Sequence, residues 1–230
     1  MLRRIVFSAA ISGALAGLFL FAIQAIFVNP LILEAETYEN AATQPATEAH
    51  SHDSTAVAGH SHGHGEESAE ENRVLWTAIT NVITGIGFGL ILIAGFALRG
   101  DVDLRRGIVW GIAGFVAFNL APALGLPPEL PADFAAPLAA RQMWWVMTVV
   151  GTAGGLALIA FTQSWFTRII GLAVIALPHI IGAPHPEQAG GLAPDDLRWQ
   201  FQIAALVTMA LFWTALGGIS GYLFRRLENA

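Results

Sequence analysis

The chain has 230 residues, of which 55% are hydrophobic and 12% are charged, and its net charge is −6. Its mean hydropathy is +0.59. A soluble domain carries about 25% charged residues, so the composition indicates an integral membrane protein. Cysteine is absent, which excludes disulfides and thiolate metal sites. No basic patch indicates nucleic-acid binding, and no nucleophile, Walker or H-E-x-x-H motif indicates an enzyme.

Six apolar stretches predict transmembrane helices, because a bilayer core requires roughly 20 apolar residues per helix. The fifth stretch is the weakest, since it is short and contains Pro178, so a bundle of five helices stays open. The N-terminal apolar run is longer than the 7–15 residues usual in a signal peptide, and we predict that it is retained. The fold class is therefore an all-α, polytopic bundle in one membrane domain, residues 1–230. The predicted spans are 5–28, 74–98, 107–125, 143–161, 168–183 and 200–224.

The arginines predict the orientation of the bundle, because cytoplasmic loops are enriched in basic residues. With six spans, most arginines fall on one side, which we expect to be the cytoplasmic side of a bacterial inner membrane, with the N-terminus there. The opposite side is acidic and carries the long first loop. The arginines on the predicted inner side are Arg3, Arg4, Arg99, Arg105, Arg106, Arg168, Arg225 and Arg226. Those on the outer side are Arg73, Arg141 and Arg198.

Residues 34–72 form this first outer loop, and their polar composition predicts disorder in the absence of a ligand. The loop is rich in histidine, in His-x-His spacing. In an extended chain this spacing puts both rings on one side, and imidazole suits Co, Ni, Cu and Zn ions. We expect modest, exchangeable capture of a transition-metal ion; the alternative is a polar linker with incidental histidines. The candidate ligands are His50, His52, His60, His62 and His64.

The two later outer loops resemble each other, since each runs from a proline in the ascending span through a Pro/Glu turn to an arginine and tryptophan. The first hairpin shows a weaker echo of this pattern. The repeat predicts three helical hairpins in parallel orientation, as in transporter folds with internal repeats. We expect Arg141 and Arg198 to pair with acidic residues of these turns. The candidate acids are Glu129, Asp133, Glu187 and Asp195.

His179 follows Pro178 inside the fifth span, and an ionisable side chain at membrane depth is by default a functional hypothesis. His185 and Glu187 lie just beyond it. We expect these three residues to act as transit ligands for a metal ion. The alternative for His179 is a hydrogen-bonded side chain that caps a broken helix. The intramembrane amides of Gln24, Asn81 and Asn119 are expected to hydrogen-bond across helices.

Three stretches, LPPELPADFAAPLAARQMWWVMT, IALPHIIGAPHP and FWTALGGISGYLFRR, together with the His-rich loop, resemble the CbtA family of probable cobalt transporter subunits. The resemblance covers nearly the whole chain. It implies a small multi-spanning protein, usually assigned five helices, that is linked to cobalamin-regulated genes and works with a second, small, His-containing membrane protein. The implied function is a permease subunit for uptake of Co²⁺ or a related divalent metal, without a tightly bound cofactor. The alternative is a non-transporting metal or pH sensor, or an accessory scaffold.

Overall fold

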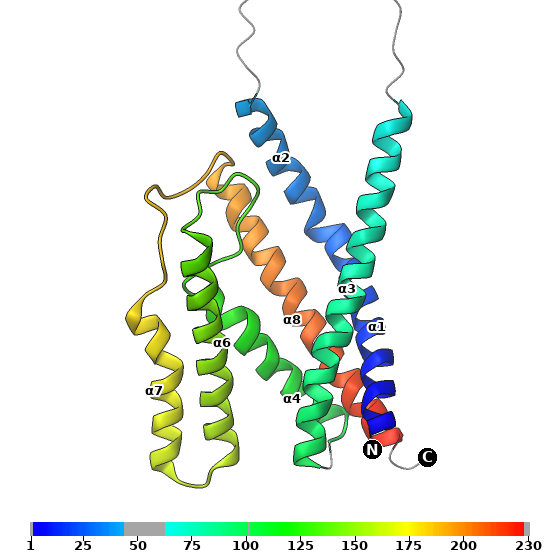
Figure 1. The fold of residues 1–230 in the computed structure, drawn as a ribbon, viewed down its shortest axis with the longest axis vertical. Coiled ribbons are helices and arrows are strands. Elements are labelled where there is room, and N and C mark those ends of the chain that lie inside the picture. Colours follow the sequence, from blue (N-terminus) through cyan, green and yellow to red (C-terminus); the bar gives the residue numbers. More distant parts are fainter. Residues whose placement is uncertain (1, 44–62, 101, 228–230) are drawn as a thin grey trace, which may run out of the picture.

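The computed structural model describes residues 2–43, 63–100 and 102–227, and these residues form an all-helical bundle (Figure 1). The prediction of an all-α membrane fold is confirmed. The third predicted span is continuous across three assigned pieces, of which the middle one is π-helical. The elements are α1 (Leu2–Phe27), α2 (Asn29–Thr43), α3 (Gly63–Arg99), α4 (Leu104–Phe115), η1 (Val116–Leu120), α5 (Ala121–Ala123), α6 (Leu138–Phe161), α7 (Trp165–Ile181) and α8 (Asp195–Arg226).

Five stretches are long and apolar enough to cross a membrane: Arg3–Phe27, Asn72–Arg99, Leu104–Ala123, Leu138–Phe161 and Asp195–Arg226. The weak fifth span of the sequence is the shorter α7, which has 17 residues and is about 25 Å long at 1.5 Å per residue. Figure 1 shows α7 running antiparallel to α6, and both chain ends at the same end of the bundle. The chain therefore reverses direction at each of six helices, although α7 is shorter than the others.

Helices extend into both ends of the predicted loop at 34–72, so the prediction of disorder is wrong for 34–43 and 63–72. The intervening residues 44–62 lie outside the described part of the chain. One reason is composition, because Glu and Ala are good helix formers and recur at both ends of the loop. A second is tertiary: α2 buries Ala35 in a cluster with Leu130, Leu197 and Phe201. A short apolar stripe on α2 thus finds a partner that the loop's average composition conceals.

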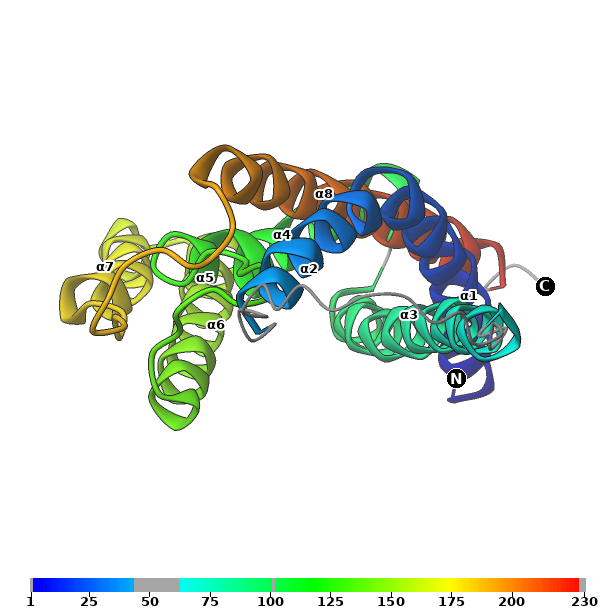
Figure 2. The ribbon, with the colours of Figure 1, turned by 90° about the horizontal axis from the view of Figure 1, so that it is seen from above.

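Glycines decide which helices pair. Gly85 of α3 lies against the Gly13 carbonyl of α1, and Gly155 of α6 against the Gly171 carbonyl of α7. Between α4 and α8, Gly107 meets the Gly217 carbonyl in the same way. The observed pairs are therefore α1–α3, α4–α8 and α6–α7, which Figure 2 shows from above.

This pairing corrects the prediction of three parallel hairpins. The first hairpin, α1 with α3, is confirmed. The second and third are wrong, because α4 packs mainly on α8, and α6 packs on α7 across the opposite, inner turn. Each close approach needs glycine on both backbones, since small residues let membrane helices approach. Glycine positions therefore override sequence adjacency.

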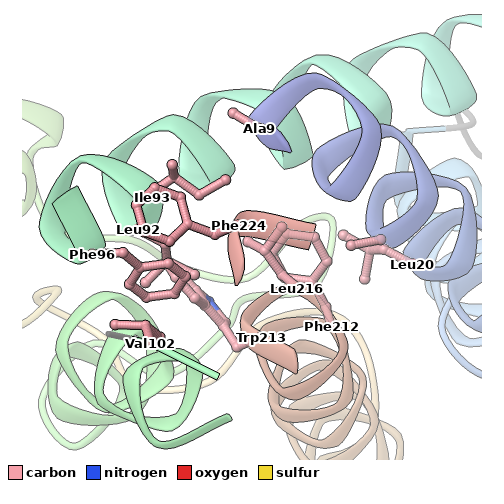
Figure 3. Close-up of a cluster of buried hydrophobic side chains, with 11 residues drawn as sticks. Ala9, Leu20, Leu92, Ile93, Phe96, Val102, Phe212, Trp213, Leu216 and Phe224 are labelled. Carbon is pink, nitrogen blue, oxygen red and sulfur yellow. The ribbon is translucent and has the colours of Figure 1, made fainter. Parts of the chain in front are cut away.

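The main core lies where α1, α3, α4 and α8 meet (Figure 3). Trp213 is fully buried there, and its indole Nε1 donates to Asn119 Oδ1 at 2.7 Å. Asn81 Nδ2 donates to Gln24 Oε1 at 2.8 Å, linking α3 to α1. The expectation that Gln24, Asn81 and Asn119 bond across helices is confirmed. These bonds hold the bundle together where lipid provides no alternative partner.

Candidate functional site

The outer loops 124–137 and 182–194 are joined into one cap. Phe134 N donates to Gly190 O at 2.9 Å, and Leu192 N donates to Ala132 O at 3.3 Å. These two bonds flank an isolated antiparallel bridge between Asp133 and Gly191. The sequence repeat thus marked two loops that fold together, although their helices pair differently.

Arg198, at the start of α8, fastens this cap. Its Nε lies 3.0 Å from Asp133 Oδ1, its Nη2 donates to Ala193 O at 3.0 Å, and its Nη1 pairs with Asp195. The Arg198 and Asp133 side chains are only 15% and 5% exposed. Asp133 also accepts a hydrogen bond from Leu130 N at 2.8 Å. The pair is therefore buried and has further hydrogen bonds, as a stable internal ion pair requires.

The other two outer arginines also pair with acids. Arg141 of α6 bonds to Glu129, and Arg73 of α3 lies 3.2 Å from Glu36 of α2 in an exposed position. The expected pairing of Arg141 and Arg198 with the outer acids is confirmed. Among the described residues Glu187 is not one of their partners. Each outer arginine thus fastens one outer segment to the start of a descending helix.

A pocket of about 210 Å³ lies between the two outer loops, and Glu129, Asp133, His185, Arg198 and Gln202 contribute its polar lining. A larger pocket of about 720 Å³ adjoins it and shares Glu129. The two carboxylates in the small pocket are matched by Arg198 and, beyond Glu129, by Arg141. A bare divalent cation would meet these guanidinium groups at close range, so the paired carboxylates act first as structural ties.

Glu129 has a perturbed acidity with a testable consequence. Burial raises the pKa of its carboxyl from the ordinary 4.5; Arg141 opposes this rise and Asp133 adds to it. The folded state therefore holds the proton more tightly than the unfolded chain, and this contribution to stability is lost as pH rises from 4.5 through the raised pKa.

Glu129→Gln cannot ionise, so its free energy of unfolding relative to the wild type should increase as pH rises through this window. Thermal unfolding at a series of pH values measures the difference. A difference that stays constant across the window would contradict the expectation.

His179 lies half-buried in the last turn of α7, beside α6. Its ring centroid is 5.7 Å from that of Trp144, in an edge-to-face arrangement. Trp144 Nε1 donates to the carbonyl of Pro178 at 3.1 Å, and Gly182 N donates to the same oxygen at 3.0 Å. The carbonyl that Pro178 deprives of its helical donor belongs to Val174, and it faces Gly151 of α6. Both oxygens near His179 are thus directed at neighbouring protein groups.

The other predicted ligands are dispersed or undescribed. His185 and Glu187 are placed in the outer loop that follows α7. The backbone of His64 lies in the first turn of α3, and His50, His52, His60 and His62 lie outside the described residues. Within the described ranges, no three His, Asp or Glu side chains gather as a metal site. The predicted ligand set is therefore untested as a whole.

Two threonines of α6 were not singled out from the sequence. Thr148 and Thr152 are fully buried. Thr148 Oγ1 donates to Trp144 O at 2.9 Å, whereas Thr152 Oγ1 has no hydrogen-bond partner among the described residues. Their spacing of four residues within an apolar span was the available signal, since it places both on one helix face.

Comparison with known proteins was informative at the level of the family. The model of a family described as "Probable cobalt transporter subunit (CbtA)" matches residues 2–225. No curated protein and no solved structure matches the chain.

Proposed function

Because the chain belongs to the CbtA family of probable cobalt transporter subunits, we propose that it carries Co²⁺, or a related divalent transition metal, inward across a bacterial inner membrane. Membership supports a role in cobalt transport as one component of an assembly, and the apolar helices support a multi-pass membrane protein. The match over nearly the whole chain is the observation that carries the proposal. A small His-containing membrane protein is the partner that we propose.

The bundle's two ends support an inward direction. The chain termini and the turns at 100–103 and 162–164 lie at one end in Figure 1, and that end carries the larger set of arginines. The positive-inside rule makes it cytoplasmic. The acidic outer end would concentrate cations, and the histidines of the first outer loop would bind the metal ion. His179, at the outer end of α7, would then receive it.

Cobalt flux into liposomes tests this function directly. The purified chain would be reconstituted with and without the His-containing partner, under a proton gradient and a membrane potential. We expect Co²⁺ accumulation that depends on the chain. No flux under any of these conditions would favour a non-transporting role. One observation supports that alternative: the intramembrane amides Gln24, Asn81 and Asn119 are all engaged in the bundle's own hydrogen bonds.

Deleting residues 48–65 tests the capture role of the first outer loop. The deletion should raise the apparent KM for cobalt and leave uptake at saturating cobalt unchanged, because an exchangeable capture site raises only the local ion concentration. The matched control replaces the loop's histidines with asparagine at unchanged length and should behave like the deletion. Equal uptake at limiting cobalt in all three proteins would exclude capture.

His179→Phe separates ligation from packing. Phenylalanine preserves an aromatic ring beside Trp144 but cannot bind a metal ion. If His179 is a transit ligand, uptake should fall on the order of tenfold or more, since each 1.4 kcal/mol of lost stabilisation is a factor of ten in rate. Ile180→Phe, at the neighbouring position that is 78% exposed, is the control and should retain uptake. Normal flux by His179→Phe would leave His179 with a packing role.

A further inference from the structure

A second polar pocket lies at the opposite end of the bundle from the outer loops, where α4 begins and α8 ends. Its volume is about 410 Å³, and its lining is Asp103, Leu104, Arg105, Tyr222, Arg225 and Arg226. Its position is firmly set, because Gly221 of α8 packs against the Asp103 carbonyl and Gly107 packs against the Gly217 carbonyl. The pocket is thus built on a tight crossing of two helices.

The pocket carries an excess of positive charge, since among the described residues Asp103 is the one carboxylate beside three arginines in its lining. Asp103 is already engaged as the N-cap of α4: its Oδ1 accepts from Arg106 N at 2.9 Å. That backbone hydrogen bond, followed by the nearby arginines, lowers the pKa of Asp103 against a smaller opposing effect of burial. Asp103 also lies 3.8 Å from Arg225 Nη1. It therefore stays ionised and offsets about one of the three positive charges.

The arginines suit a phosphate group. Arg226 Nη1 donates to Tyr222 Oη at 2.5 Å, which holds that side chain over the pocket. Arg105, Arg225 and Arg226 are all exposed, so their remaining N–H groups face the opening. A guanidinium presents its N–H groups as a planar fork that matches phosphate oxygens, and charge-assisted bonds of this kind are the strong ones.

The surface beside the pocket is apolar, which identifies the kind of phosphate compound that fits. Val109 and Ile112 follow Arg105 by four and seven residues, so they share its face of α4. They are 66% and 48% exposed, and Leu104 at the rim is 47% exposed. A cationic pocket that continues into an exposed apolar stripe along a membrane helix matches a phosphodiester headgroup and its acyl chain. A soluble phosphate would use the arginines alone.

We propose that this pocket binds the headgroup of an anionic phospholipid of the inner leaflet, with the phosphate between Arg105, Arg225 and Arg226 and an acyl chain along Val109 and Ile112. Basic pockets between transmembrane helices on the cytoplasmic side are suited to such headgroups. The site is separate from the cobalt route and would join α4 to α8 at the membrane surface.

Lipid titration of the purified full chain in zwitterionic nanodiscs tests the proposal, with phosphatidylglycerol as the probe and native mass spectrometry or a labelled lipid as readout. Arg105→Gln/Arg226→Gln should weaken phosphatidylglycerol binding roughly 25-fold, at about fivefold for each arginine. The control, Arg3→Gln/Arg168→Gln, removes the same charge from the same side of the bundle but outside the pocket. It should bind like the wild type. Circular dichroism establishes that each variant is folded.

Two further arms distinguish the source of the phosphate and the importance of geometry. Inorganic phosphate or glycerol phosphate in millimolar excess should not displace the lipid; displacement would assign the pocket to a soluble anion and overturn the proposal. Equal losses in the pocket variant and the control would show diffuse attraction to basic residues instead of a site. Arg105→Lys/Arg226→Lys keeps the charge but not the fork, and it should restore binding partly.

Discussion

Gly85→Ala should destabilise the bundle by about 1–3 kcal/mol, the usual cost of overpacking a close contact. The added methyl group would overlap the carbonyl oxygen of Gly13 and crowd the backbone at Gly17. The helix backbones of α1 and α3 cannot yield locally as a flexible side chain would, so the two helices must separate. Denaturant titration in mixed micelles, followed by circular dichroism, measures the free energy of unfolding.

Gly87→Ala provides a matched control two residues away on the same helix. Nothing lies within 4 Å of the methyl group that it would add. Because alanine is a better helix former than glycine by about 1 kcal/mol, this variant should be neutral or more stable than the wild type. The adjacent pair Gly155→Ala and Gly154→Ala repeats the design at the α6–α7 crossing, where the first contacts Gly171 O at 2.5 Å and the second contacts nothing within 4 Å. Equal effects within each pair would contradict the glycine crossings.

Arg198→Ala should cost about 3–5 kcal/mol, the range for removing one partner of a buried ion pair. It leaves the Asp133 carboxylate 5% exposed and without its guanidinium, and it removes the donor to Ala193 O. The two outer loops would then lose the side chain that ties them to α8. Thermal unfolding of the purified variant measures the loss, and proteolysis at 182–194 should become faster.

Arg73→Ala is the control for this prediction, because its pair with Glu36 is exposed, at 50% and 35%. Exposed pairs contribute less than about 1 kcal/mol, so this variant should unfold close to the wild type. Arg198→Ala/Asp133→Ala should recover part of the loss, since it leaves no buried charge unpaired. A cost for Arg198→Ala as small as that for Arg73→Ala would show that the cap is held by its backbone bonds and not by the ion pair.

The two ends of the bundle thus have different chemistry. At the outer end, arginines are matched with carboxylates in a folded cap, and His179 lies beneath it beside Trp144. At the inner end, three arginines surround an open pocket in whose described lining Asp103 is the one carboxylate. The first arrangement supports a structural cap over the proposed cobalt route, and the second supports a contact with anionic lipid.

Several features could be predicted from the sequence because they depend on local composition. Hydropathy over a window of about 20 residues identifies a membrane helix wherever it packs, so the strong spans are recovered within a few residues. The outer arginines and acids lie close along the chain or in loops of matching pattern, so most of their pairing could be expected. The amides at Gln24, Asn81 and Asn119 needed partners inside lipid, and the neighbouring helices were the available source.

Other features were decided by tertiary structure, because they depend on how each helix is rotated about its axis and on what it meets. Gly107 and Gly155 look alike in sequence, but Gly107 faces α8 and Gly155 faces α7, and these contacts replace two of the expected hairpins. The polar composition of α2 predicts a disordered loop, yet Ala35 and its neighbours are buried against Leu130 and Leu197 from distant segments. The sequence by itself determined the membrane spans and the charge of each side; the packing of distant backbones decided their partners, because close contact requires two complementary surfaces and each lies on a different part of the chain.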